Sequence, residues 1–447
     1  MAIWIKNPRA ILAENADGGI LVDKGRIIEL IPIGAVPVAT PDEVFEARDL
    51  VIVPGLINTH HHFYQSLTRT LPGALNQELF GWLTALYPVW ANLEPEFIKQ
   101  ATRLVLAELV LSGCTTTTDH HYVFPPGTED AIDIQVAEVR EMGMRAVLTR
   151  GSMNLSQKDG GLPPDSVVQD MDVILADSER LVAKYHETGA DAFIQIALAP
   201  CSPFSVTRAL MQETAQLAEQ KGVLLHTHLA ETKDETAFCR ERFGCTPVEY
   251  LEETGWLGPR TWLAHGIHFS EQDIKRLGKA DVAVSSCSCS NMHLASGMCP
   301  VCDLEAAGAK IGLGIDGSAS NDASNMIEEV RQAFLLQRLN YGAAKVSHLD
   351  ALRWATAGSA DCIRRPDLGR IEIGANADLA MFKLDEMRHS GGHDPLATLV
   401  ICGASRAEYV MIGGNWIVEK GAIPGLDTKG LIAAHTQAAR KLVAKTG

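Results

Sequence analysis

The sequence predicts an α/β protein in which a (β/α)8 TIM barrel carries a small β-sandwich domain built from both termini. The middle of the chain supports the barrel, because eight apolar strand-like runs alternate there with helical patterns. The two ends support the sandwich, because both are rich in short β-branched runs between Gly and Asn turns. A length of 447 residues, 46% of them hydrophobic, is enough to bury a barrel core and an appended module.

The predicted sandwich consists of residues 1–55 and 366–427. Strand-like runs lie at 2–7, 19–34 and 49–55, and again at 368–384 and 407–423. Because two strand-rich ends flank a different middle, we expect them to pair into one composite domain. Residues 428–447 indicate a C-terminal surface helix with no evident chemistry.

The predicted barrel consists of residues 56–365. Its first strand lies in LVIVPGLINTH (50–60), and seven further runs follow at 115–121, 144–151, 191–200, 223–231, 261–269, 281–288 and 310–317. Helical patterns such as 97–113 and 207–222 separate them. A doubly wound open sheet is the alternative, but it typically carries a Gly-rich phosphate turn between its first strand and helix, and none is found there. GxxxxGK does not occur, and the one GxGxxG match, GLGIDG, lies in the eighth run at 312–317.

Charge and composition narrow the class of ligand. The formal net charge of -16 argues against a nucleic-acid groove or an anionic membrane surface, because both reward clusters of Lys and Arg. The negative net charge is more compatible with a small neutral substrate than with an anionic one. The sequence has no signal-like apolar segment and no apolar run near the ~20 residues that span a bilayer, so we expect a cytoplasmic protein with its ten cysteines reduced.

Three consecutive histidines follow the first barrel strand. In an extended segment, alternate side chains point in opposite directions, so His60 and His62 share one face while His61 faces the other. In a TIM barrel the chemistry lies at the carboxyl ends of the strands. We therefore expect His60 and His62 to be metal ligands, and His61 either to be a packing residue or to support the ligands from behind.

Other strand ends carry further polar side chains in register with these histidines. They are His226, His228 and Glu231 after the fifth strand, His265 and His268 after the sixth, and Asp316 after the eighth. Neutral imidazoles with one carboxylate and no thiol suit Zn(II) or Fe(II) and leave a position for water. A metal in this setting lowers the pKa of bound water toward ~7, and Glu231, three residues past His228, is the natural proton carrier.

Other hydrolytic designs lack their motifs in this chain. A serine hydrolase of the α/β type needs GxSxG, and none is present. The zinc deaminases of the cytidine type need HxE with PCxxC, and no HxE occurs. The metalloprotease helix HExxH is also absent.

These motifs together resemble the amidohydrolase superfamily over essentially the whole chain. VPGLINTHHH is similar to the family's opening segment, HTHLAE to its fifth strand, LAHGIH to its sixth and GIDGSASND to its eighth, while GRIEIGANADLAMF is similar to its closing sandwich segment. The resemblance implies that one metal is bound by His60, His62, His228 and Asp316. It also implies that Glu231, His265 and Asp316 act on the bound water and the substrate.

The resemblance further implies one divalent metal per subunit, Zn²⁺ being expected and Fe²⁺ the alternative. Many two-metal relatives carry a carboxylated lysine on strand four, where this sequence reads AFIQIALAP with no lysine. The segments HLAE, CSNMHLASGMCPV and IDGSASND are similar to the branch that deaminates purines, pterins and triazines. The implied activity is hydrolysis of a C–N bond in a cyclic amidine.

The implied substrate is a free purine-like base. Where nucleoside-specific relatives have a ribose-binding Glu and a PHAP segment, this chain has Trp90 and Cys201, and unpaired ribose hydroxyls would cost on the order of 1–3 kcal/mol. The runs HHHFYQSLTR, LYPVWANL and TTTTDHHYVFP resemble branch members that convert 8-oxoguanine and water into uric acid and ammonia. A hydroxyatrazine-type triazine (ethyl)aminohydrolase and a guanine or isocytosine deaminase are the alternatives.

Candidate substrate-binding residues follow from the same comparison. Gln65 is placed to read the amide edge of a ring, and Trp90, Tyr122 and Cys201 are candidates for the pocket wall. The resemblance implies a homo-oligomer, and the negative net charge argues against a nucleic-acid or membrane partner. A catalytically inactive binding protein is the alternative of another class, but such a protein would lack a ligand or the Glu of strand five, and none is missing here.

Overall fold

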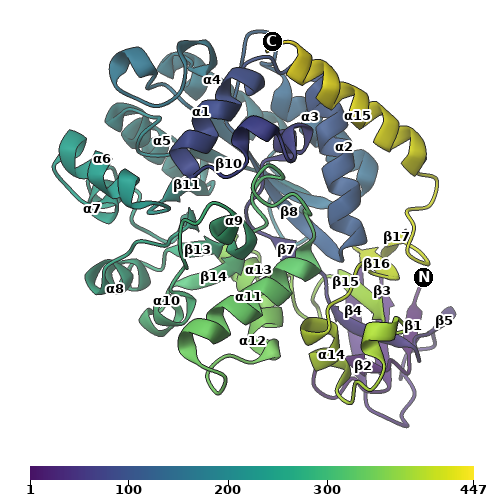
Figure 1. The fold of residues 1–447 in the computed structure, drawn as a ribbon. Helices are drawn as coiled ribbons and strands as arrows, with labels where there is room; N and C mark the ends of the chain where they lie inside the picture. Colours follow the sequence, from purple (N-terminus) through teal and green to yellow (C-terminus); the bar gives the residue numbers. More distant parts are fainter. Residues whose placement is uncertain (447) are drawn as a thin grey trace.

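The computed structural model describes residues 1–446, whose strands form three sheets (Figure 1). One is an eight-stranded sheet with parallel pairing that curls into a barrel. The backbone N–H of Thr59 donates to the carbonyl of Leu313 at 2.9 Å and links the two end strands. The barrel strands are β7 (Leu56–Asn58), β8 (Cys114–His121), β9 (Arg145–Ser152), β10 (Ile194–Pro200), β11 (Leu225–Leu229), β12 (Thr261–His265), β13 (Ala283–Ser286) and β14 (Lys310–Leu313).

Helices cover the outside of the barrel, as the end-on view of Figure 1 shows. The predicted TIM barrel is thus confirmed. The helices within the barrel part are α1 (Leu79–Trp90), α2 (Pro95–Leu111), α3 (Ala131–Met142), α4 (Met171–Tyr185), α5 (Arg208–Lys221), α6 (Lys233–Phe243), α7 (Pro247–Glu253), α8 (Glu271–Lys279), α9 (Ser288–His293), α10 (Val301–Ala307), α11 (Met326–Tyr341), α12 (His348–Arg353) and α13 (Ser359–Cys362).

The apolar run 50–60, predicted as one barrel strand, is divided between two sheets. Its first half, β6 (Leu50–Pro54), belongs to a terminal sheet, and only its second half, β7, belongs to the barrel. The chain changes sheets at Gly55, where a Cβ would lie 2.1 Å from Oγ1 of Thr115. A glycine fits there because the Thr115 side chain occupies the space that a Cβ would need.

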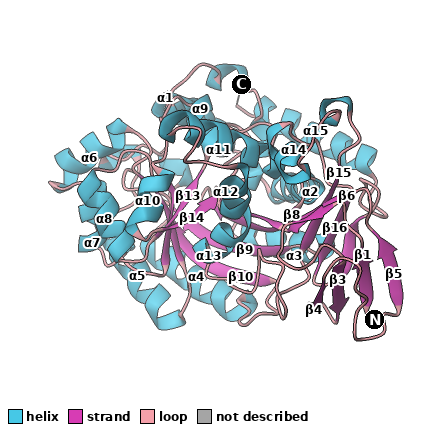
Figure 2. Ribbon diagram, turned by 90° about the horizontal axis from the view of Figure 1, so that it is seen from below, coloured by secondary structure: helices cyan, strands magenta, loops and turns pink. Residues whose placement is uncertain are grey.

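The other two sheets are assembled from the terminal segments and share one apolar core (Figure 2). The first has the order β4-β3-β1-β5 and comes from the N-terminal segment alone; the second, β17-β16-β15-β6-β2, combines both termini. Within 368–384 only residues 379–383 form a strand, so the expected strand there is shorter than predicted. The strands are β1 (Ile3–Lys6), β2 (Ala10–Ile11), β3 (Gly19–Asp23), β4 (Arg26–Ile31), β5 (Glu43–Glu46), β15 (Leu379–Lys383), β16 (Tyr409–Ile412) and β17 (Asn415–Val418).

Two helices lie outside the barrel core: α14 (Pro395–Ile401) and α15 (Thr428–Ala444). Figure 1 shows α15 running along the outer side of α2. Its buried side chains include Leu431 and Leu442, so this helix lies on the surface with one face packed against the barrel. None of the helices in residues 1–446 is both long enough and apolar enough to cross a membrane.

Candidate active site

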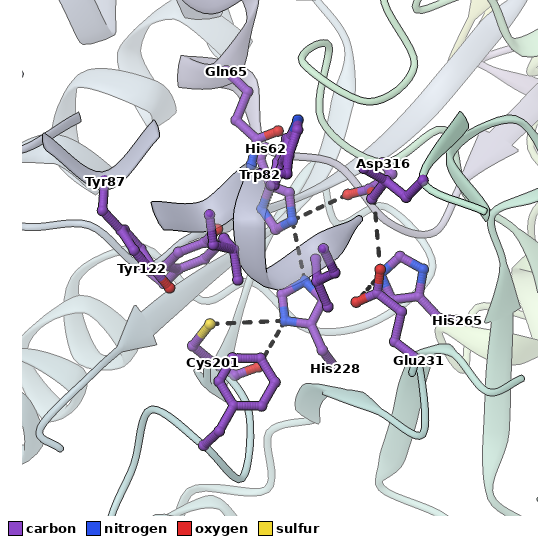
Figure 3. A pocket seen from close by; sticks show the side chains of 14 residues that line it. His62, Gln65, Trp82, Tyr87, Tyr122, Cys201, His228, Glu231, His265 and Asp316 are labelled. Atoms are coloured by element: carbon purple, nitrogen blue, oxygen red, sulfur yellow. Dashed lines mark hydrogen bonds and ion pairs between the residues drawn. The ribbon is translucent and has the colours of Figure 1, made fainter. Parts of the chain in front are cut away.

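The strand-end residues converge at the carboxyl end of the barrel. His60 and His62 follow β7, His228 lies near the end of β11, His265 ends β12, and Asp316 follows β14. Figure 3 shows His62, His228 and Asp316 directed toward one another, with Glu231 and His265 beside them. Residues more than 250 positions apart in the chain thus meet in one site, because parallel barrel strands end at the same face.

Backbone carbonyls determine which imidazole nitrogen carries the proton. Nδ1 of His62 lies 2.7 Å from the carbonyl oxygen of His120, and Nδ1 of His228 lies 2.7 Å from that of Cys201. Because a carbonyl oxygen can only accept, each Nδ1 carries a hydrogen. The Nε2 atoms therefore present lone pairs, and these two atoms lie 3.2 Å apart without a proton between them.

Burial keeps the imidazoles of His60 and His228 neutral. It lowers the pKa of His228 to about 3 and holds the pKa of His60 well below its ordinary value. Nε2 of His60 has no hydrogen-bond partner among residues 1–446. A neutral imidazole with a free lone pair is the form that binds a metal ion.

The spacing of the donor atoms fits a divalent metal. Oδ1 of Asp316 lies 3.3 Å from Nε2 of His60 and 3.2 Å from Nε2 of His62. Nitrogen and oxygen ligands that lie about 2.0–2.2 Å from one zinc ion are roughly 3–4 Å from one another. Three lone pairs and a carboxylate at these distances repel one another, and a cation at their centre removes the repulsion. The residues present therefore fit a divalent metal.

Glu231 and His265 lie beside this cluster. Oε2 of Glu231 is 3.5 Å from Nε2 of His265, which is 4.0 Å from Oδ2 of Asp316. Burial, reinforced by the negative charge of Asp316, raises the pKa of Glu231 well above its ordinary value. A carboxyl group of this kind can hold a proton at neutral pH and exchange it with a reactant.

Two site residues adopt a left-handed backbone conformation that is rare outside glycine. The φ angle is +70° at His265 and +67° at Asp316. Polar contacts hold both side chains: Nδ1 of His265 donates to Oδ1 of Asn291 at 2.9 Å, and Oδ2 of Asp316 accepts from the Ser290 hydroxyl at 2.6 Å. Such strain is concentrated at functional sites, where the surrounding structure determines the geometry.

A small pocket, with a cavity volume of about 30 Å³, lies beside the cluster. Each lining residue is at most 8% exposed, so the pocket is enclosed. Within the described chain, none of the lining residues is a Lys or Arg. The lining consists of His62, Gln65, Leu79, Trp82, Leu83, Tyr87, Tyr122, Cys201, Phe204, His228, Glu231, His265, Leu294 and Asp316.

The structure places three of the four candidate substrate-binding residues at this pocket: Gln65, Tyr122 and Cys201. Oε1 of Gln65 is buried and has no hydrogen-bond partner among residues 1–446. Trp90 is the exception. Its indole is fully buried, packs on the ring of Trp82 and donates to Oγ1 of Thr68 at 3.2 Å, and Trp90 is not among the residues that line this pocket.

Sequence reasoning missed the residues that form the roof of the pocket. Helix α1 supplies Leu79, Trp82, Leu83 and Tyr87, a stripe of large apolar side chains at i, i+3, i+4 and i+8. That spacing was visible in the sequence, but a core helix has the same pattern. A ring nitrogen of His120, on β8, also lies within 4.8 Å of the ligand atoms of the histidine cluster.

Comparison with known proteins gives the family. The profile of the amidohydrolase family matches residues 51–417. The chain belongs to the amidohydrolase family. As an amidohydrolase it is a hydrolase, and it is 58% identical over 444 residues to the 8-oxoguanine deaminase of Pseudomonas aeruginosa, with 99% of each chain covered.

Three further proteins match at lower identity. Hydroxydechloroatrazine ethylaminohydrolase of a Pseudomonas species is 36% identical over 441 residues, covering 95% of this chain and 91% of the relative. Among solved structures, the atrazine chlorohydrolase of Arthrobacter aurescens complexed with zinc has a TM-score of 0.92 at 30% identity, with 98% and 100% of the chains covered. An adenosine deaminase of Xanthomonas campestris with bound zinc has a TM-score of 0.88 at 26% identity, covering 99% and 98%.

Proposed function

We propose that this amidohydrolase is a metal-dependent deaminase of a free purine-like base, converting 8-oxoguanine and water into uric acid and ammonia. The observation that carries the proposal is the convergence of three imidazole lone pairs and the Asp316 carboxylate beside the protonatable Glu231 in an enclosed pocket. The 58% identity to an 8-oxoguanine deaminase supports the choice of substrate.

His60, His62, His228 and Asp316 are the proposed ligands of one Zn²⁺ ion per chain, Fe²⁺ being the alternative. Zinc in two solved relatives supports this choice. A divalent metal in this place supplies Lewis acidity, which lowers the pKa of a water molecule toward ~7 and provides a nucleophile at neutral pH. The fixed tautomers of His62 and His228 keep their lone pairs directed at it.

Glu231 is the proposed proton carrier. It takes one proton from the attacking water and passes it to the ring nitrogen next to the carbon that bears the amine. Its raised pKa suits both halves of this transfer. His265 and Asp316 orient the water and take its second proton, which leaves with ammonia.

The pocket's charge distribution supports a free base as substrate. No cationic side chain of the described residues lines it, so nothing there neutralises a phosphate or carboxylate group. Its carboxylates, Glu231 and Asp316, both lie at the reacting end, which leaves none to bind ribose hydroxyls. Aromatic side chains such as Tyr122 and Tyr87 match a flat ring.

Replacing Glu231 with Gln tests the proton transfer. We expect deaminase activity to fall by roughly 10²–10⁴-fold, because the amide cannot accept or donate the proton. Zinc content should stay near one ion per chain, since Glu231 is not a proposed ligand. The exposed Glu241 is the matched control, and Glu241→Gln should keep full activity. Unchanged turnover in Glu231→Gln would remove this residue from the chemistry.

A substrate panel tests the choice of base. Purified enzyme is supplied with 8-oxoguanine, guanine, isocytosine, adenosine and hydroxyatrazine, and both amine release and ring product are measured. We expect the highest kcat/KM for 8-oxoguanine, with uric acid and ammonia in equal amounts. Release of ethylamine from hydroxyatrazine at a higher kcat/KM would favour the triazine activity that the 36% identical relative is named for.

The expected homo-oligomer and the cytoplasmic location stay predictions. Size-exclusion chromatography with light scattering measures the first, and fractionation of cells measures the second.

A further inference from the structure

His226 lies beneath the proposed metal site and is not among its ligands. Its Nε2 is 2.8 Å from Nδ1 of His60, and its own Nδ1 is 2.8 Å from the carbonyl oxygen of Trp262. The His226 side chain is fully buried. The three groups therefore form one hydrogen-bonded chain from β12 through β11 to the segment after β7.

The carbonyl at the end of this chain determines its direction. Because the Trp262 carbonyl can only accept, Nδ1 of His226 carries the hydrogen. In a neutral imidazole the second nitrogen, Nε2, then carries a lone pair, and it lies 2.8 Å from Nδ1 of His60. That lone pair must accept from Nδ1 of His60. Nε2 of His60 is consequently left unprotonated and faces Asp316 at 3.3 Å.

The Trp262 side chain holds His226 and the His60 segment in place. Its ring stacks on the imidazole of His226, with centroids 4.3 Å apart and an interplanar angle of 18°. Its indole N–H donates to the carbonyl of Thr59, the residue before His60, at 3.0 Å. Trp262 thus has three roles: its carbonyl accepts the hydrogen bond from His226, its ring holds the plane of the His226 imidazole, and its indole N–H holds the backbone next to His60.

We propose that His226 is a positioning residue that holds His60 in the tautomer required for metal binding, so that retention of the metal depends on the His226 side chain. This inference rests on the proposed metal site, but not on the identity of the substrate. His62 and His228 obtain the same tautomer from backbone carbonyls. His60 obtains it from a side chain, which a substitution can remove.

Three variants of the holoenzyme test the proposal, with Zn²⁺ affinity measured by competition with a chelator. His226→Phe keeps an aromatic ring for Trp262 but removes both hydrogen bonds, and we expect the affinity to fall about 10–100-fold. His226→Gln can accept from His60 through Oε1 and donate to Trp262 through Nε2, so its affinity should stay within about 3-fold of wild type. His186→Phe removes a half-buried imidazole that bonds β10 instead, and should leave the affinity unchanged.

Nitrogen NMR of wild-type, ¹⁵N-histidine-labelled holoenzyme provides a measurement that does not require the Phe variant to fold. We expect the His226 signals to show Nδ1 protonated and Nε2 unprotonated, with assignment from His226→Gln. Wild-type zinc affinity in a folded His226→Phe, or a proton on Nε2 of His226, would overturn the proposal. Neither measurement uses substrate, so a wrong choice of base would not affect them.

Discussion

Gly317 follows the proposed ligand Asp316, and its missing side chain leaves room for Gln65. A Cβ on Gly317 would lie 1.8 Å from Oε1 of Gln65. The backbone of Gly317 is not in the left-handed region, so an alanine is conformationally allowed. The glycine therefore matters for the space it leaves, and a methyl group there has to displace the flexible Gln65 amide from the pocket.

We expect Gly317→Ala to raise KM for the purine base roughly 5–10-fold with a smaller effect on stability. The physical reason is the loss of one hydrogen bond between the Gln65 amide and the ring, worth about 1 kcal/mol. Steady-state kinetics measures this change. Gln65→Ala should raise KM by a similar factor.

The double variant Gly317→Ala with Gln65→Ala tests whether the two substitutions raise KM through the same loss, that of the contact between Gln65 and the substrate. If Gly317 acts only by placing Gln65, the double variant should be no worse than Gln65→Ala alone. Additive losses would mean that the methyl group harms the site in another way, for example by shifting Asp316.

Helix α1 is the element that closes the pocket. It contributes four lining residues and is joined to the loop after β14 by the indole of Trp82, which donates to the carbonyl of Ala319 at 3.1 Å. Phe80 also contacts Phe204, with ring centroids 5.1 Å apart. Because every lining residue is at most 8% exposed, we expect part of this lining to move when a substrate enters.

We expect helix α1 to move away from the pocket more often in Trp82→Phe. This substitution keeps an aromatic ring at position 82 but removes the hydrogen bond to the carbonyl of Ala319. Cys201 reports the opening, since its thiol lies in the closed pocket and burial raises its pKa to about 12. Alkylation of Cys201, followed by mass spectrometry, should be about 5–10-fold faster than in wild type, as expected for the loss of about 1 kcal/mol.

Cys239, buried in α6 away from the pocket, is the internal control for global unfolding. Its alkylation rate should be unchanged by Trp82→Phe. A parallel rise at both cysteines would mean that the variant is less stable overall and would contradict opening of the roof.

The barrel and the terminal sheets are joined by a buried ion pair. At the start of β9, Nε of Arg145 donates to Oδ2 of Asp378 at 2.7 Å, and Oδ1 of Asp378 also accepts from the backbone of Gly413 at 2.7 Å. Both charged side chains are 2% exposed. An exposed pair, Arg26 with Asp191, spans the same two units at the surface.

We expect Asp378→Asn to lower the free energy of unfolding by about 3–5 kcal/mol, because it leaves a buried guanidinium without its counter-charge. Urea denaturation followed by circular dichroism measures this change. Asp191→Asn is the matched control, and it should cost less than about 1 kcal/mol, since its carboxylate is 92% exposed. Equal effects of the two substitutions would show that the buried pair contributes no more than the surface one.

The sequence by itself determined the barrel, the composite terminal sheets and the strand-end residues. These features depend on local patterns, namely apolar runs, their periods and the polar residue that closes each run. His60, His62, His228, Glu231, His265 and Asp316 could be named because parallel barrel strands bring their carboxyl ends to one face whatever the details of packing.

Only the tertiary structure decided which side chains touch. The sequence placed Trp90 in the pocket wall, but the turn of α1 directs Trp82 and Tyr87 there and leaves Trp90 behind them. The acceptor for His60 comes from a residue 166 positions away, and the space for Gln65 from a glycine on another strand end. Contacts of this kind depend on distances of a few ångströms between distant segments, and no local pattern carries that information.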